Sequence, residues 1–402
     1  MLRGGLLIGL AGVGAGAVQA ETSPYYLGAS QRFTRNSNVF LERDASARSD
    51  TISSTGIRLG FDQPISRQRL SASLSANANR YGSLDQLNNT DYALDARLDW
   101  ETVEHLSGNL VLGSRESLSP DATALSQNVR NLFRVDSVGF QAQLGGVTRW
   151  SFDTGAAYTR TRYSDAFYER NNSTQQAVNA GVRVTPASGL TLRAGLRHAN
   201  IDYPKANNEV SRNDFDLSAF VNPGGASVFN ARFSLTRESH TLVDRNLRSW
   251  TGQLGWQWKP TGKLSTNLSL TRDTSNGAYD FTSGVFNVGS SENRLATTLA
   301  LTANWEVTSK IAVVGNLSHQ RRTLDNALTI GSSGGSGVLP SSAKDRINSI
   351  GLNVQYAVTR HVDLGCGVSW SDRSVASQSG SSTLTWDYDV TTYSCFGQIM
   401  LR

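Results

Sequence analysis

The stretch LATTLALTANW at residues 295–305 decides the fold class. Its odd positions are mostly apolar and its even positions small or polar, so that Leu295, Thr297, Leu299, Leu301, Ala303 and Trp305 alternate with Ala296, Thr298, Ala300, Thr302 and Asn304. Successive side chains of a β-strand point to opposite faces of its sheet. The stretch therefore predicts a strand with one apolar face and one polar face.

The same alternation recurs from Tyr25 onward, for example at 190–197, 264–270 and 350–356. A soluble β-sandwich also shows alternating strands, so the pattern alone leaves two classes of all-β protein open.

The connections between the strands separate these two classes. Short turns rich in Gly, Pro and polar residues are expected around 63–67, 102–106, 145–148, 186–189, 223–226, 260–262, 307–309 and 359–361. Longer polar loops are expected near 41–52, 82–91, 115–131, 164–174, 204–213, 239–246, 275–292, 323–345 and 373–388. These connections imply about eighteen strands with alternating short and long links, the asymmetry of outer-membrane barrels. We therefore predict an all-β, transmembrane, antiparallel up-and-down β-barrel with short periplasmic turns and long extracellular loops, integral to a bacterial outer membrane.

The overall composition agrees with a barrel and excludes a helical membrane protein. The mean hydropathy is −0.33, and past the N-terminus the chain lacks the apolar runs of about 20 residues that membrane-spanning helices need.

Residues 1–20 read as a signal peptide, with Arg3, an apolar stretch and a Val18-Gln19-Ala20 cleavage site. Residues 21–402 then form one barrel domain without a separate plug domain. About eighteen strands leave a water-filled interior, which only inward-folding loops would narrow. The Gly/Ser-rich segment Gly331–Ser342 is either such a loop or, the reading we favour, a mobile external loop.

Aromatic residues mark both ends of the expected strands. Tryptophans near the short turns predict an interfacial girdle at one rim: Trp100, Trp150, Trp256, Trp258 and Trp305. Aromatics near the long loops suggest either sugar-stacking platforms or the second girdle: Tyr81, Phe167, Tyr168, Tyr279, Trp386 and Tyr388.

Strand parity places charges of both signs on the polar, lumen-lining face. The arginines are Arg58, Arg97, Arg183, Arg193, Arg197 and Arg232, and the aspartates are Asp62, Asp95, Asp99, Asp153, Asp216 and Asp363. Such a wall is hydrated and shows no ion preference. Two interpretations remain open: a conduit for a hydroxyl-rich polymer, or cross-strand ion pairs that stiffen the barrel, which we favour for any single residue.

The two cysteines fall in the last expected hairpin. Pairing Trp370 with Thr391 places Cys366 opposite Cys395, on the apolar face. Directly opposed residues are slightly too far apart for an unstrained bridge, so we favour a contact pair over a disulfide.

The sequence carries no catalytic or metal-binding pattern. The five histidines are scattered, and G-x-S-x-G, P-loop and H-E-x-x-H motifs are absent. We expect neither an enzyme nor a cofactor or metal, and the modest net charge of +5 gives no reason to expect nucleic acid as a partner.

Three short stretches resemble the EpsL-like outer-membrane barrels of exopolysaccharide biosynthesis loci, which are grouped with the β-barrel porins. They are FTRNSNVF at 33–40, the spaced residues Tyr81, Leu84, Tyr92, Asp95 and Trp100, and WKPTGKL at 258–264. The resemblance spans nearly the whole chain after residue 20. It implies an outer-membrane pore in exopolysaccharide export, with an exopolysaccharide as cargo and a periplasmic polysaccharide-export protein as partner. Outer-membrane lipid and lipopolysaccharide would surround such a barrel. The alternatives are a general diffusion porin for small solutes and a non-conducting structural or adhesive surface barrel.

Overall fold

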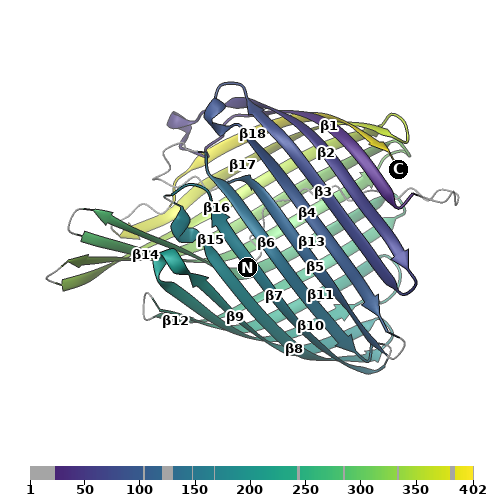
Figure 1. The fold of residues 1–402 in the computed structure, drawn as a ribbon, viewed down its shortest axis with the longest axis horizontal. Helices are drawn as coiled ribbons and strands as arrows, with labels where there is room; N and C mark the ends of the chain where they lie inside the picture. The colour runs from purple at the N-terminus through teal and green to yellow at the C-terminus, as the bar shows by residue number, and fades with distance from the viewer. Residues whose placement is uncertain are drawn as a thin grey trace.

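The chain forms a closed β-barrel of 18 antiparallel strands (Figure 1). The computed structural model describes residues 23–102, 105–119, 130–146, 148–166, 168–241, 245–283, 286–332, 335–380 and 385–401, so the expected signal peptide lies outside the described residues. Each strand pairs with its neighbours along the chain, and β18 pairs with β1 to close the ring. The predicted barrel class and strand number are confirmed. No helix in these ranges is both long and apolar enough to cross a membrane.

The strands increase in length toward the C-terminal half. Their bounds are β1 Tyr25–Asn36, β2 Asp50–Ile65, β3 Gln68–Tyr81, β4 Asn89–Glu101, β5 Leu106–Leu118, β6 Leu132–Leu144, β7 Trp150–Tyr163, β8 Ser173–Ala187, β9 Leu190–Tyr203, β10 Asn208–Val221, β11 Ser227–His240, β12 Arg245–Thr261, β13 Leu264–Ser283, β14 Phe286–Glu306, β15 Ile311–Ser332, β16 Gly335–Ala357, β17 Val362–Gly380 and β18 Tyr388–Leu401. Four short 3-10 helices lie in the loops: η1 Asp44–Ser46, η2 Asp85–Leu87, η3 Glu169–Asn171 and η4 Pro204–Ala206.

The apolar face of each strand points out of the ring. Within β14, Leu299 and Trp305 are 45% and 51% exposed, and the neighbouring strands repeat this pattern with Leu317 and Ile350. A continuous belt of exposed apolar side chains is costly in water and favourable in lipid. Tryptophans near the short turns, such as Trp150 and Trp305, lie at one edge of this belt, where the interfacial girdle was predicted.

All eight predicted short turns connect strands at one end of the barrel (Figure 1). The β8–β9 turn shows why glycine is needed at one position. Gly189 has a φ of +78°, and a Cβ there would lie 1.9 Å from the Asn222 carbonyl oxygen. Any other residue would be strained by both its backbone conformation and this contact.

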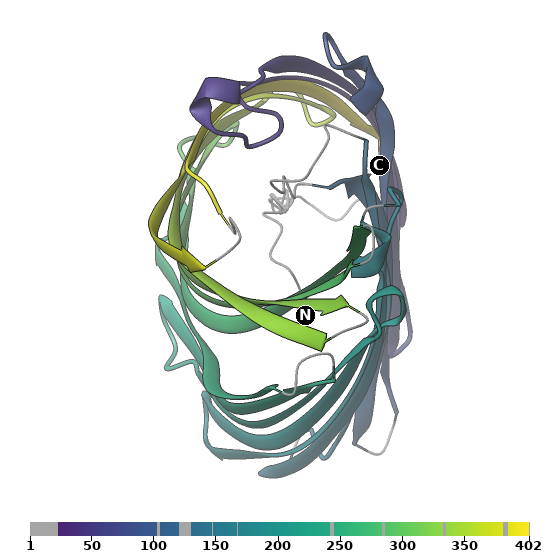
Figure 2. The same cartoon turned by 90° about the vertical axis from the view of Figure 1, so that its left-hand side faces the viewer.

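Two predicted long loops are instead strands. The segments predicted as loops at 275–292 and 323–345 continue β13 into β14 and β15 into β16 as paired hairpins, each interrupted by only two residues outside the described ranges. The prediction of a loop at Gly331–Ser342 was therefore wrong, because the backbone on both sides of 333–334 is strand. These hairpins project beyond the barrel wall (Figure 1) and lean across its mouth (Figure 2).

The shorter loops at this mouth pack against one another. The Trp386 indole nitrogen donates to the Leu41 carbonyl oxygen at 2.8 Å, and the buried Asn38 amide donates to the carbonyl oxygens of Glu42 and Asp389. Trp386, Tyr168 and Tyr388 are at most 8% exposed. These three aromatics are neither open stacking platforms nor a lipid girdle. Phe167 and the Tyr279 side chain lie outside the described residues.

The last hairpin has the register expected from the sequence. Trp370 lies opposite Thr391, and Cys366 lies opposite Cys395. The two cysteines form a disulfide with a Cα–Cα distance of 4.1 Å, where a contact pair had been favoured. Both are exposed on the outer face of the barrel.

Candidate functional site in the barrel interior

The interior face of the wall is the face opposite the exposed apolar belt. On β9, for example, Arg193 and Arg197 alternate with the outward residues Leu192 and Leu196. The same parity applies to every charged residue that the sequence assigned to this face: Arg58 and Asp62 on β2, Asp95, Arg97 and Asp99 on β4, Asp153 on β7, Arg183 on β8, Asp216 on β10, Arg232 on β11 and Asp363 on β17.

The structure brings some of these charges together. Asp153 lies 2.6 Å from the Arg193 guanidinium and 3.7 Å from that of Arg183, so three adjacent strands share one ion cluster. Arg97 and Asp99 pair at 2.7 Å on the same strand, where both remain half exposed. Exposed pairs of this kind contribute at most about 1 kcal/mol each.

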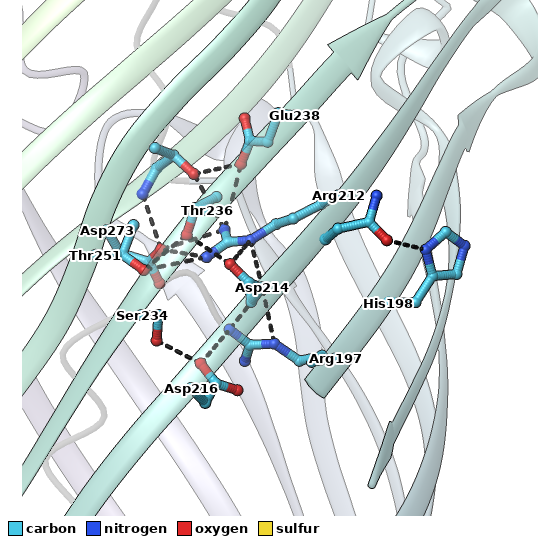
Figure 3. A network of polar contacts seen from close by, with 12 residues as sticks. Arg197, His198, Arg212, Asp214, Asp216, Ser234, Thr236, Glu238, Thr251 and Asp273 are labelled. Carbon is cyan, nitrogen blue, oxygen red and sulfur yellow. Dashed lines mark hydrogen bonds and ion pairs between the residues drawn. The ribbon is translucent and has the colours of Figure 1, made fainter. Parts of the chain in front are cut away.

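The most buried interior group was not predicted. Arg212 and Asp214 on β10 meet Glu238 on β11, and these three side chains are at most 7% exposed (Figure 3). The Arg212 guanidinium lies 2.9 Å from Asp214 and 3.4 Å from Glu238, and it reaches Asp273 on β13 at 3.3 Å. This network therefore joins strands that are not neighbours in the sheet.

Hydroxyl groups pair with some of the oxygens of this network, while Glu238 Oε2 is buried without a hydrogen-bond partner among the described residues. Thr236 donates to Asp214 at 2.5 Å, Thr274 donates to Glu238 at 2.6 Å, and Arg212 donates to Thr274 at 3.0 Å. Arg197, one of the predicted residues, binds Asp214 from the other side at 2.8 Å. These ion pairs and hydrogen bonds offset much of the cost of burying the charges, because an unpaired charge in a dry interior is costly.

An apolar cluster covers this network on the loop side. Ile201, Tyr203, Ala206 and Val210 are at most 6% exposed and pack together on η4 and the adjoining ends of β9 and β10. Strand β13 contacts both η3 and η4, so its extension crosses the mouth and touches the opposite loops (Figure 2). Buried side chains and the β13 strand therefore occupy this side of the mouth.

A second buried ion group lies beneath the other hairpin. Asp345 on β16 binds the Arg322 guanidinium of β15 and accepts a hydrogen bond from Thr385 at 2.7 Å, with Arg373 at 3.9 Å. Asp345 was assigned to a loop from the sequence. Aligning 311–357 as one continuous hairpin would have placed Asp345 opposite Arg322 and so predicted this ion pair.

The opposite wall is polar and open. A column of short polar side chains follows the interior face of β3: Ser71, Ser73, Ser75, Asn77 and Asn79. The register sets this column beside Asp91, Asp95 and Arg97 of β4. Asn77 and Asn79 donate to Asp91 at 2.6 and 2.5 Å. The wall offers many exchangeable hydrogen bonds.

Three of the histidines have polar partners nearby. His198 meets Asn213, His319 meets Asn348, and His361 meets the Met400 carbonyl oxygen. Within the described ranges, no three His, Cys, Asp or Glu side chains form a group that would hold a metal ion.

Comparison with known proteins finds similar solved structures and a family. No curated protein matches the chain. Among solved structures, the outer membrane protein opdK of Pseudomonas aeruginosa is 10% identical with a TM-score of 0.48, covering 94% of this chain and 99% of its own. The siderophore receptor PirA of the same organism is 10% identical with a TM-score of 0.41, covering 96% and 81%. The FrpB iron transporter of Neisseria meningitidis is 8% identical with a TM-score of 0.42, covering 94% and 82%. The profile of the outer membrane beta-barrel porin family MtrB/PioB matches residues 66–396, and the chain belongs to this family and is an integral outer-membrane barrel.

Proposed function

We propose that this barrel is a conduit through which an exopolysaccharide leaves the cell. The observation that carries the proposal is the polar column on the interior face of β3, from Ser71 to Asn79, beside the charged and amide groups of β4. Hydroxyl and amide groups exchange hydrogen bonds with sugar hydroxyls at little net cost, because each bond to the wall replaces a similar bond to water. A sugar polymer can therefore slide along such a wall. The resemblance to EpsL-like barrels supports the same cargo.

The conduit would be gated by the β13–β14 extension. This extension contacts η3 and η4 on the opposite side of the mouth, above the buried network around Arg212. Delivery would fall to a periplasmic polysaccharide-export protein, and lipopolysaccharide would surround the outer belt.

The direct test is a strain that lacks the gene, with polysaccharide quantified separately in the medium and in the periplasm. We expect external polymer to fall and periplasmic polymer to rise, and complementation with the intact gene to reverse both. Unchanged external polymer would refute export.

Two variants of β3 test whether the export of polysaccharide depends on the polar column of this strand. The triple variant S71L/S73L/S75L makes the interior column apolar, whereas A72L/A76L/A78L adds similar bulk to the outward face of the same strand. We expect only the interior variant to block export while both barrels reach the membrane. Equal export by the two variants would remove the β3 column from the mechanism.

A diffusion porin for small solutes is the second candidate, favoured by the balanced interior charges and the porin family. Stable open conductance of the purified, unmodified barrel would favour it. A non-conducting structural or adhesive barrel is the third candidate, and a deletion strain with normal external polymer whose purified barrel never conducts would favour that reading.

A further inference from the structure

A cavity of about 280 Å³ opens on the interior wall where β18, β1, β2, β3 and β4 meet. Its polar lining includes Arg32, Arg58, Ser75, Asn77 and Gln398, all on the interior face by strand parity. It lies on the open polar side of the barrel, away from the buried network around Arg212.

The two arginines of this cavity lack the ion pairs that several other interior arginines form. Arg97, Arg193 and Arg212 each pair with a carboxylate, whereas neither Arg32 nor Arg58 forms an ion pair with any carboxylate in the described ranges. The Arg32 guanidinium instead lies 5.1 Å from the centre of the Phe396 ring. Both side chains are only half-buried, so an incoming ligand can reach them.

The one carboxylate in the cavity neutralises only part of this charge. Asp91 accepts hydrogen bonds from Asn77 and Asn79 at 2.6 and 2.5 Å, and these amides hold it on the β4 side. Counting the charged side chains of the lining, Arg32, Arg58 and Asp91, the cavity carries a net positive charge of one.

A glycine keeps the cavity open between the two arginines. Gly56 lies opposite Ser30, and a Cβ at Gly56 would lie 2.3 Å from Asn77 Oδ1 and 2.8 Å from Ser30 Oγ. Such contacts are far below van der Waals separation, so a larger residue would displace the polar groups that line the cavity.

We propose that this cavity binds the carboxylate of an acidic sugar unit, such as a uronic acid. Guanidinium groups match carboxylates with paired, charge-assisted hydrogen bonds, and neighbouring Ser, Asn and Gln groups suit the hydroxyls of a sugar ring. The volume is close to the lower bound of ligand pockets, about 300 Å³, and so suits a single sugar unit. The proposal rests on the proposed function only in taking that sugar to be part of the exported polymer.

The test is equilibrium dialysis of trigalacturonate against the purified full barrel in detergent, with neutral maltotriose as the comparison ligand. We expect trigalacturonate to bind and maltotriose to bind at least about tenfold more weakly, because only trigalacturonate can form charge-assisted hydrogen bonds with the two guanidinium groups. R32Q/R58Q should raise the Kd for trigalacturonate about tenfold or more. R35Q on the outward face of β1 is the matched control and should leave the Kd unchanged.

A charge-preserving variant keeps the test valid if the glutamine variant misfolds. R32K/R58K retains both charges but loses the planar guanidinium groups that donate paired hydrogen bonds to a carboxylate. Its Kd should therefore fall between those of wild type and R32Q/R58Q. Equal binding of the two trisaccharides, or wild-type affinity in R32Q/R58Q, would overturn the site. Binding without an export defect in the deletion strain would refute the proposed function alone, and an export defect without binding would refute the site alone.

Discussion

Replacing Arg212 with methionine removes the guanidinium that joins β10, β11 and β13. In the native barrel this group lies 3.4 Å from Glu238, whose side chain is fully buried, and 2.9 Å from Asp214. Asp214 would keep Arg197 at 2.8 Å. Glu238 would keep the Thr274 hydroxyl but lose its arginine.

The expected cost follows from burial. Removing one partner of a buried ion pair typically destabilises a protein by about 3–5 kcal/mol, because the remaining charge stays uncompensated. R97M is the matched control, since Arg97 and Asp99 are 48% and 42% exposed and such a pair contributes at most about 1 kcal/mol. Adding E238Q to R212M should recover about 1–3 kcal/mol, because a neutral amide still accepts from Thr274.

The assay is urea unfolding of the refolded barrel in lipid vesicles, followed by tryptophan fluorescence, with all variants compared under one set of conditions. A loss for R212M no larger than that for R97M would refute the reasoning. So would an R212M/E238Q variant that is less stable than R212M.

Three further perturbations test other parts of the barrel by the same unfolding assay. C366S/C395S, or reduction of the wild type, should lower the free energy of unfolding by about 3–4 kcal/mol, because the bridge spans 29 residues of chain; an unchanged value would show that the bridge does not constrain the unfolded state. Burial raises the pKa of the Asp50 carboxyl, but hydrogen bonds from backbone amides of the β3–β4 loop outweigh burial, so its pKa lies below the usual value. The advantage of wild type over D50N should therefore be full above about pH 5 and fade as the pH falls through the lowered pKa, and an advantage that grows in acid would contradict this sign. G189A should cost about 1–3 kcal/mol because of its positive φ and the close carbonyl, whereas G262A, where a Cβ meets open space, should cost little; equal losses would count against this account of the turn.

The parts of the fold that face lipid could be predicted from the sequence. Alternation at 295–305 gave the β14 strand, and the Trp370–Thr391 alignment gave the register of the last hairpin. Both succeed because a strand with one face in lipid must alternate, and a shift of one residue would turn its apolar side inward.

The parts above the lipid could not be predicted in the same way. Where both faces of a strand meet water or other polar chain, alternation disappears, so the extended hairpins of β13–β16 read as polar loops. Arg212 lay in a segment read as a loop for the same reason, although β10 places Val210, Arg212, Asp214 and Asp216 on one face. The pairing of Arg212 with Asp273 also depends on how β13 crosses the mouth, and strand parity carries no information about that crossing.

The central claim is that a water-filled conduit passes through the barrel and is gated by the β13–β14 extension. The most direct measurement is single-channel conductance in planar bilayers of wild type and of a variant in which residues 277–292 are replaced by an Asn-Gly turn, with a matched replacement of 327–340 in β15–β16 as the control. The account predicts low conductance for wild type and the control, and a large, stable increase for the β13–β14 variant. A β13–β14 variant that folds and remains as impermeable as wild type would contradict a conduit gated by this extension.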